Sequence, residues 1–184
     1  VARFSVPGAD PRFGIVDTND DGVDEVVVLR GDPIAASIDG GGYETTGERI
    51  PLADVKLLAP VIPRSKVVCI GMNYAEHRAE LGHVGNEAPL MFLKPNTSIV
   101  GPGDAIQIPP VEGRIVHEGE LAIVIGKVAK QVKAENWRDV VFGFTIANDV
   151  SARDQMFADG QWARAKGYDT FCPIGPWIET DLDP

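Results

Sequence analysis

Residues 117–126, HEGELAIVIG, restrict the fold of this chain more than any other segment. Side chains alternate between the two faces of a β-strand, so Glu118 and Glu120 share one face with small apolar residues. His117 points to the opposite face, together with leucine and isoleucine. Because both faces are apolar beyond the glutamates, we expect a strand that runs into a hydrophobic core.

The two glutamates need compensation for their charge. They lie only about 6.5–7 Å apart along the strand. If they were buried alone they would repel each other, and at least one would bind a proton. Either the pair lies at a wet edge or a cation neutralises it. Asp149 favours the cation, because it follows the apolar segment VVFGFTIAN at its polar end.

Glu118, Glu120 and Asp149 are therefore the candidate metal ligands. Three oxygen ligands without a thiolate or imidazole cluster favour Mg²⁺ over zinc, with Mn²⁺ or Ca²⁺ as substitutes. His117 is a weaker candidate for a fourth ligand, since it points to the other strand face.

Residues 1–58 contain short apolar segments separated by turn residues. The segments RFSVP, FGIVD, EVVVL and AASI are typical of strands, with glycine, aspartate, asparagine and proline between them. No pair of catalytic-type residues occurs here, so we expect a small N-terminal β domain. The stretch 49–64 contains three prolines and is typical of a linker, which places a second domain at residues 59–184.

Strands also dominate the second domain. The predicted strands are KVVCIG, PLMFLKP, HEGELAIVIG, VFGFTIAND and FCPIGPWIE. A short helix is predicted at NYAEHRAEL and a helix-like run at KAENWRDV, whereas residues 151–167 are polar and contain glycine. The fold class predicted for the whole chain is therefore mainly β with few helices.

Composition limits the classes of partner. The formal net charge of −10 argues against nucleic acid, because phosphate contacts need clustered lysine and arginine, and against an anionic membrane surface. No apolar run reaches the ~18 residues of a membrane span, and no signal peptide is recognisable, so we expect a cytoplasmic protein. Cys69 and Cys172 are expected to be small buried apolar residues rather than a disulfide.

The chain resembles the fumarylacetoacetate hydrolase family. Five motifs in order carry the resemblance and cover most of residues 65–180: IGMNYAEHRAELG, PLMFLKPNTSIVGPGDAI, HEGELAIVIG, NDVSARD and DGQWARAKGYDTFCPIGPWI. The resemblance implies a mixed β-roll catalytic domain, a small N-terminal β domain and a homodimer. It also implies Mg²⁺ or Mn²⁺ at Glu118, Glu120 and Asp149. Members of the family continue for several tens of residues beyond this match, so we expect the catalytic domain to lack its C-terminal part here.

The same resemblance assigns catalytic residues. His77 and Glu80 match a pair that positions and deprotonates water; at i, i+3 spacing they share a helix face, so Glu80 can orient the imidazole. Lys166 matches the substrate lysine of the family. Arg153 and Lys94 are candidates for contacts with a substrate anion, or alternatively for structural salt bridges. His83 has no assigned role.

The expected chemistry is stabilisation of an enolate. A 2-oxo acid can bind a cation through its carboxylate and keto oxygen, and a divalent cation stabilises the negative charge that develops on that oxygen. We expect hydrolysis of a C–C bond in an acylpyruvate-type diketo acid. The alternatives are isomerisation of 2-hydroxyhepta-2,4-diene-1,7-dioate, a step in aromatic catabolism, and decarboxylation of oxaloacetate.

A different class of function also has to be considered. A non-catalytic, metal-stabilised binding domain would keep the three carboxylates but would need no general base. The presence of His77 and Glu80 argues against this alternative.

Overall fold

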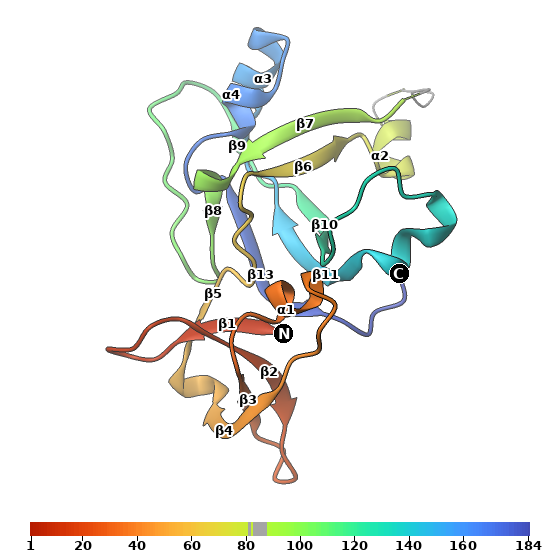
Figure 1. The fold of residues 1–184 in the computed structure, drawn as a ribbon. Helices are drawn as coiled ribbons and strands as arrows, with labels where there is room; N and C mark the ends of the chain where they lie inside the picture. The colour runs from red at the N-terminus through yellow and green to blue at the C-terminus, as the bar shows by residue number, and fades with distance from the viewer. Residues whose placement is uncertain (81, 83–87) are drawn as a thin grey trace.

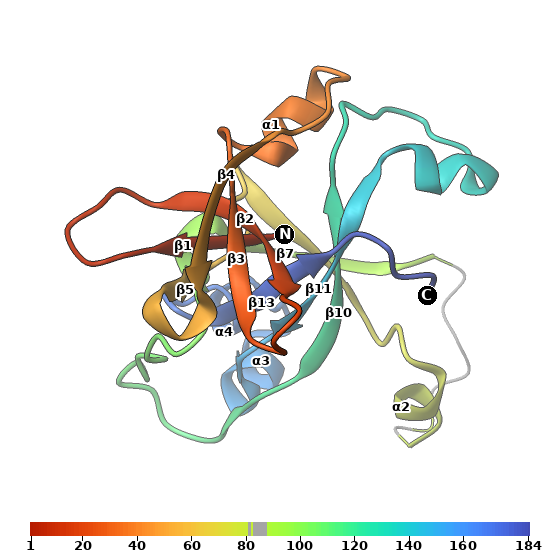
Figure 2. The same ribbon diagram turned by 90° about the horizontal axis from the view of Figure 1, so that it is seen from below.

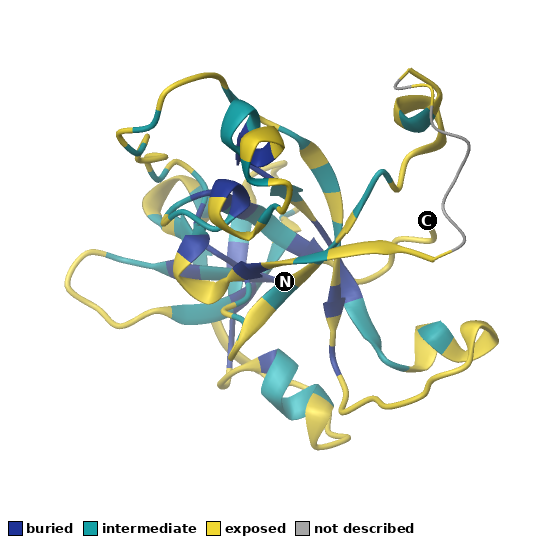
Figure 3. Ribbon diagram, turned by 90° about the horizontal axis from the view of Figure 1, so that it is seen from above, coloured by how far each residue is buried: buried dark blue, intermediate teal, exposed yellow. Residues whose placement is uncertain are grey.

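The computed structural model describes residues 1–80, 82 and 88–184 (Figure 1). Strands dominate it, and the helices are short, so the predicted fold class is confirmed: an N-terminal β unit precedes a mixed β domain. The buried residues gather near the centre of the molecule, where the strands cross, and the peripheral loops are exposed (Figure 3).

The N-terminal unit is a five-stranded antiparallel sheet in the order β4-β3-β2-β1-β5. Its strands are β1 (Ala2–Ser5), β2 (Arg12–Thr18), β3 (Asp24–Leu29), β4 (Thr45–Pro51) and β5 (Lys56–Leu58). Phe4, Val26 and Val28 form its buried core. Gly14 packs against this core, and no side chain would fit at its position, because a Cβ atom there would lie 2.2 Å from Cγ1 of Val26.

Two predictions for this unit were wrong. The segment AASI belongs to helix α1 (Pro33–Ile38), because Asp32 caps the helix and Pro33 occupies its first turn. The Asp32 carboxylate accepts hydrogen bonds from the backbone N–H groups of Ile34 (2.9 Å) and Ala35 (3.2 Å). The stretch 49–64 is not a free linker, since it completes β4, forms the 3₁₀ turn η1 (Leu52–Asp54) and adds β5 to the edge of β1.

The second domain is built around a four-stranded sheet in the order β10-β11-β13-β8. The strands are β8 (Ile99–Val100), β10 (Gly119–Ile125), β11 (Val141–Asn148) and β13 (Cys172–Glu179). β13 pairs with β8 in parallel and with β11 in antiparallel fashion, so the sheet is mixed. Two further antiparallel pairs complete the domain: β6 (Lys66–Gly71) with β7 (Leu90–Pro95), and β9 (Ile115–Val116) with β12 (Ser151–Ala152).

Short helices connect these strands. The predicted helix after β6 is α2 (Ala75–Glu80), and the helix-like run KAENWRDV contains the 3₁₀ helix η3 (Ala134–Asp139); another 3₁₀ turn, η2 (Asn96–Ser98), follows β7. The polar region 151–167 forms two helices that the sequence did not predict, α3 (Arg153–Asp159) and α4 (Ala163–Lys166).

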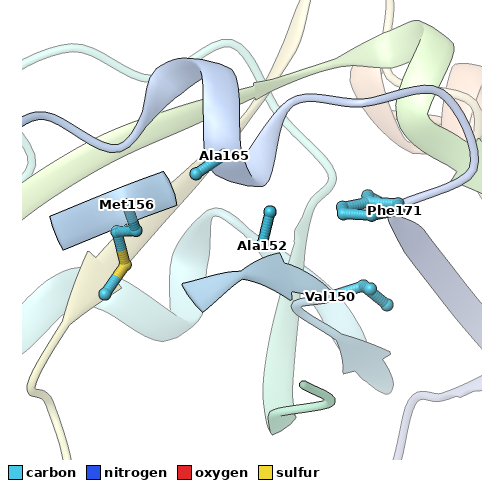
Figure 4. Close-up of a cluster of buried hydrophobic side chains, with 5 residues drawn as sticks. All are labelled: Val150, Ala152, Met156, Ala165 and Phe171. Carbon is cyan, nitrogen blue, oxygen red and sulfur yellow. The ribbon is translucent and has the colours of Figure 1, made fainter. Parts of the chain in front are cut away.

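A buried apolar cluster fixes α3 and α4 against β12 (Figure 4). Its members are Val150, Ala152, Met156, Ala165 and Phe171. Because Met156 lies on α3 and Ala165 on α4, this packing determines where the neighbouring polar side chains of both helices point. Residues on either side of these apolar positions thereby become part of the site described below.

The N-terminal sheet packs directly on the second domain (Figure 2). Val1, at the start of the chain, is buried with Val124 of β10 and Ile178 of β13, and the Ile178 N–H donates to the Val1 carbonyl at 2.7 Å. The predicted domain boundary between residues 58 and 59 coincides with the end of β5 but otherwise stays a prediction.

Strand β10 shows the predicted alternation, with one difference. Glu120, Ala122 and Val124 share the more buried face, whereas Leu121 and Ile123 on the other face are 50% and 55% exposed. The expectation that both faces enter a core was therefore wrong for this chain. None of the helices in the described ranges is long and apolar enough to span a membrane.

Candidate active site

A cavity of about 420 Å³ lies between the β6–β7 hairpin, strand β10 and helices α3 and α4. It brings together seven of the eight predicted site residues, and only Glu80 does not line it. The predicted site residues along its wall are Glu118, Glu120, Asp149, Lys94, Lys166, Arg153 and His77. His117 is exposed and does not line the cavity, as expected for the opposite strand face.

Strand pairing brings Glu118 and Asp149 together. Gly119 pairs with Asn148 across the β10–β11 ladder, so the residues just outside that pair become neighbours. The Asp149 N–H donates to the Glu118 carbonyl at 2.8 Å, and the Glu118 N–H donates to Oδ1 of Asn148 at 3.1 Å. Two carboxylates far apart in the sequence are thus held at the same end of one strand pair.

Asp149 is the most buried acidic group of the cavity, at 6% exposure. Its Oδ1 accepts a hydrogen bond from Lys94 Nζ at 2.6 Å, and its Oδ2 accepts one from Lys166 Nζ at 2.5 Å. Glu118 is more open: its Oε2 lies 3.1 Å from Lys166 Nζ, and its Oε1 lies 3.8 Å from Nη1 of Arg153. Each of these two carboxylates is therefore paired with two cationic side chains.

Glu120 lies in a less favourable electrostatic environment. Burial raises the pKa of its carboxyl group, and the nearby carboxylates of Asp149 and Glu118 raise it further. A hydrogen bond with the Tyr74 side chain acts in the opposite direction and lowers the pKa. The Tyr74 hydroxyl also accepts the Leu121 N–H at 3.0 Å, so this phenol ties the segment before α2 to β10.

Lys166 is a buried cation, not a solvated charge in a loop. Its side chain is 3% exposed, and its ammonium group donates to Glu118, Asp149 and the Ser151 hydroxyl, the last at 2.8 Å. The ring centroids of Phe92 and Trp162 lie 4.8 and 5.7 Å from Nζ. The polar contacts and the aromatic rings together determine the position of the ammonium group.

The other two cations also have protein partners. Lys94 is 1% exposed and donates to Asp149 and to the Val150 carbonyl, at 3.1 Å, so its position is that of an ion-pair partner of Asp149. Arg153 extends from α3 over the ring of Phe157, 5.5 Å from its centroid. Its longer contact with Glu118 leaves the guanidinium more accessible to a bound anion than the Lys94 ammonium.

The predicted base lies at the outer rim of the cavity. His77 Nδ1 is 3.6 Å from Oε2 of Glu80, and both side chains are exposed. The Arg78 guanidinium, which lies in α2, donates to the carbonyl of Met72 at 3.1 Å, and this bond holds the turn that leads into the helix. His83, which had no assigned role, lies outside the described residues.

The three carboxylates are the candidate ligands of a divalent cation. All three face one cavity and are hard oxygen donors, as Mg²⁺ and Mn²⁺ prefer. The raised pKa of Glu120 comes first from burial of its carboxyl group and then from the neighbouring carboxylates of Asp149 and Glu118. Both oxygens of Asp149 accept from lysines, and in the described part of the chain no three acidic, histidine or cysteine side chains group tightly enough to hold one ion. The three carboxylates thus have the donor type that a hard cation prefers, and they face the same cavity. To bind one ion together, they would have to move closer to one another.

Four other residues of the site were missed in the sequence. Tyr74, Phe92, Ser151 and Trp162 all contact a charged group of the cavity, but neither their residue type nor a local pattern marked Tyr74, Phe92 or Ser151. Trp162 had a usable signal, because it precedes Lys166 by four residues and that spacing brings side chains together on a helix. The side-chain oxygen of Gln155, which precedes Met156, accepts a hydrogen bond from the Tyr168 hydroxyl at 2.8 Å.

Both cysteines are free and line the cavity. Cys172 is buried and Cys69 is partly buried, in agreement with their predicted role as small apolar residues. Burial raises the pKa of the Cys69 thiol to about 12, and the Asp149 carboxylate contributes to that rise.

Two family models match the chain. Residues 66–184 match the model described as fumarylacetoacetate (FAA) hydrolase, C-terminal. Residues 1–60 match the model described as Rv2993c-like, N-terminal.

Individual proteins match over most of the chain. Protein Rv2993c of Mycobacterium tuberculosis is 58% identical over 139 residues, which are 76% of this chain and 52% of the relative. The mitochondrial oxaloacetate tautomerase Fahd2a of Rattus norvegicus is 46% identical over 132 residues, 71% of this chain and 42% of the relative. The chain thus spans about half the length of these curated relatives.

A solved structure extends the comparison to three dimensions. The crystal structure of a protein named 5-carboxymethyl-2-hydroxymuconate delta-isomerase, from Mycobacterium smegmatis, superposes with a TM-score of 0.86 at 46% identity. The match covers all of this chain and 67% of the other.

Proposed function

Because the chain belongs to the fumarylacetoacetate hydrolase family, we propose that it is part of a divalent-metal-dependent enzyme that hydrolyses a C–C bond of an acylpyruvate-type 2-oxo acid. The observation that carries this proposal is the convergence of Glu118, Asp149 and Lys166 in one cavity, with the buried ammonium group between the two carboxylates. Mg²⁺ is the proposed ion, and Mn²⁺ or Ca²⁺ are proposed substitutes.

Charge balance supports this class of substrate. Among the described residues that line the cavity, the charges of three carboxylates and of three lysine and arginine side chains cancel. A divalent cation would add two positive charges. The carboxylate of a 2-oxo acid and the negative charge that develops at its keto oxygen would balance them, so the site favours this chemistry over a neutral ligand.

The residues of the site would divide the work. A cation held by Glu118, Glu120 and Asp149 would supply Lewis-acid stabilisation of negative charge on the keto oxygen. Lys166 would exchange one of its three present hydrogen bonds for one to the substrate in the same region, and Arg153 would contact the substrate carboxylate. Lys94 would keep Asp149 in place, because its ammonium group already has two partners on the protein.

His77 would act as the general base. Its Nδ1 faces Glu80, which orients the ring and stabilises the imidazolium, so Nε2 is left to take a proton from water. The resulting hydroxide adds to the acyl carbonyl, the bond to the pyruvate methylene breaks, and the imidazolium returns the proton to that carbon. An acylpyruvate and water thus give a carboxylic acid and pyruvate.

A proton shift is the second candidate. Two similar proteins are named as an isomerase and a tautomerase, and the same His77 could move a proton between the enol oxygen and a carbon of a 2-oxo acid without adding water. The two reactions differ in their products, since hydrolysis divides the carbon skeleton and isomerisation preserves it.

A substrate panel on the full-length protein separates these functions. Acetylpyruvate, fumarylpyruvate, oxaloacetate and 2-hydroxyhepta-2,4-diene-1,7-dioate are each incubated with Mg²⁺ or Mn²⁺, and the products are followed by proton NMR. Release of pyruvate and a carboxylic acid supports hydrolysis, and a shifted double bond supports isomerisation. Metal binding without turnover of any of them would indicate a non-catalytic binding domain instead.

Assembly and location stay predictions. We propose a cytoplasmic homodimer that binds neither nucleic acid nor membranes. Light scattering on the full-length protein measures its mass in solution, and a monomer at micromolar concentration would contradict the proposed dimer.

A further inference from the structure

The environment of Lys166 has two chemically different sides. An ammonium group has three N–H donors, and Lys166 directs its donors to the carboxylates of Glu118 and Asp149 and to the hydroxyl of Ser151. The ring centroids of Phe92 and Trp162 lie 4.8 and 5.7 Å from Nζ, which is within the range of cation–π contacts. The Lys166 ammonium group thus donates hydrogen bonds to three oxygen-bearing side chains and is also in contact with two aromatic rings.

The position of Trp162 is set by close packing. Its indole packs edge to face with Phe92, with ring centroids 5.4 Å apart and planes at 70°. It also lies on Gly71 at the end of β6, where a Cβ atom would come within 2.4 Å of indole Cζ3 and 2.8 Å of Cη2. Any side chain at position 71 would therefore push the ring away.

Trp162 and Lys166 are also linked through the backbone. The Lys166 N–H donates to the Trp162 carbonyl at 3.0 Å, in the turn that forms α4. The indole therefore contacts the ammonium group directly, and the same helical turn carries both residues.

We propose that Trp162 is a positioning residue for Lys166. Its indole, seated on Gly71 and braced by Phe92, forms an aromatic wall that keeps the ammonium group against Glu118 and Asp149 and excludes water from its other side. The alternative is that Trp162 only fills space in the core. The proposal concerns the position of Lys166, and it rests on the proposed function only where turnover is used as a readout.

Chemical labelling of lysine tests the position directly. The full-length protein is treated with a limiting amount of acetic anhydride, without substrate or metal, and the modification rate of each lysine is measured by mass spectrometry. Exposed lysines such as Lys133 are the internal reference. We expect Lys166 to be among the slowest lysines in the unchanged protein, because its side chain is 3% exposed.

Three variants separate positioning from space filling. Trp162→Leu keeps apolar volume but removes the ring. We expect Lys166 to be labelled about tenfold faster, the increase in rate that corresponds to the loss of one cation–π contact. Trp162→Phe keeps a ring face, so its labelling rate should rise by less than about threefold. Trp137→Leu is the matched control: this half-buried tryptophan packs on Phe144, does not line the cavity, and should leave the rate at Lys166 unchanged.

Gly71→Ala provides a second route to the same displacement. The added methyl group displaces the indole while Trp162 itself is kept, so Lys166 should again be labelled faster. Gly42→Ala is its control, because a Cβ there meets no atom within 4 Å. If Trp162→Leu fails to fold, Gly71→Ala decides the question.

The outcomes are distinct. Faster labelling of Lys166 in Trp162→Leu and Gly71→Ala, in proteins that melt cooperatively, supports the proposal. An unchanged rate in both variants would overturn it. If the protein turns over a 2-oxo acid, Trp162→Leu should lower kcat by about tenfold and leave KM within about threefold; if no substrate is found, the labelling result still stands.

Discussion

The Asp149 carboxylate and the Lys166 ammonium form an almost completely buried ion pair, 2.5 Å apart, with side-chain exposures of 8% and 3%. A buried charge is expensive to leave without a partner, so each group constrains the other. Lys94, from a different strand, supplies a second cation to the same carboxylate. The position of Asp149 is therefore fixed by two lysines that the chain brings in from β7 and α4.

Removing the Lys166 charge should impair both folding and activity. In Lys166→Met, Asp149 keeps only Lys94, so we expect the free energy of unfolding to fall by about 1–3 kcal/mol. Loss of a donor near the keto oxygen should lower kcat/KM by about 100-fold or more. Urea unfolding and steady-state kinetics measure the two effects. Lys133→Met, at an exposed lysine, is the control, and wild-type stability in Lys166→Met would contradict the structural part.

His77→Ala should affect the chemistry alone. We expect kcat to fall by about 10²–10⁴-fold, as for loss of a general base, while Mn²⁺ affinity and thermal stability stay unchanged because the side chain is half exposed at the cavity rim. Kinetics, calorimetric titration and thermal melting test these points. His117→Ala is the matched control on the opposite strand face. Unchanged turnover of every tested 2-oxo acid in His77→Ala would eliminate the assigned base.

Removal of the metal should abolish activity. EDTA should stop turnover, and added Mg²⁺ or Mn²⁺ should restore it, because three carboxylates, which are hard oxygen donors, line the cavity. Asp149→Asn should weaken Mn²⁺ binding by about tenfold or more, whereas Asp154→Asn, at a surface carboxylate paired with Arg114, should not. An enzyme insensitive to chelators would exclude the metal mechanism.

Asp104 should contribute a pH-dependent part of the stability. The Lys56 ammonium group and the Gly101 N–H lower the pKa of its carboxyl group. A lowered pKa in the folded state means that the contribution is present above the unfolded pKa of about 3.9. It is lost as the pH falls through the folded value.

We therefore expect Asp104→Asn to lower the urea midpoint at pH 7, and the difference from wild type to shrink near pH 3, roughly where the carboxyl group becomes protonated. Asp20→Asn, at an exposed aspartate in the turn between β2 and β3, is the control. An equal difference at both pH values would show that Asp104 acts only through packing.

Cys69 should be unreactive in the folded protein. Because burial raises the pKa of its thiol to about 12, the thiolate needed for alkylation is scarce at pH 8. Labelling with N-ethylmaleimide should be much slower in native than in urea-unfolded protein. Rapid native labelling at this residue would show that the β6 strand opens readily.

Much of the strand layout followed from local patterns. The apolar segments that became β6, β7, β10, β11 and β13 were recognised from composition and alternation, because a strand that borders a core must present apolar side chains with a period of two. The helix α1 was missed, although the Asp32–Pro33 pair is a local signal for a helix start. The edge strand β5 was missed because a three-residue strand has too few side chains to show a pattern.

By itself, the sequence named the three carboxylates, the His77–Glu80 pair and Lys166 as candidate site residues; all of them except Glu80 line one cavity, and their chemical roles stay predictions. Only the tertiary structure decided their partners, that is, the burial of Lys166 against Asp149 and the contact of Trp162 with Gly71. The physical reason is that residue type and spacing determine what a side chain can do chemically. The register of β10 on β11 and the packing of α4 against β7 determine which distant side chains it meets, and no local pattern encodes those contacts.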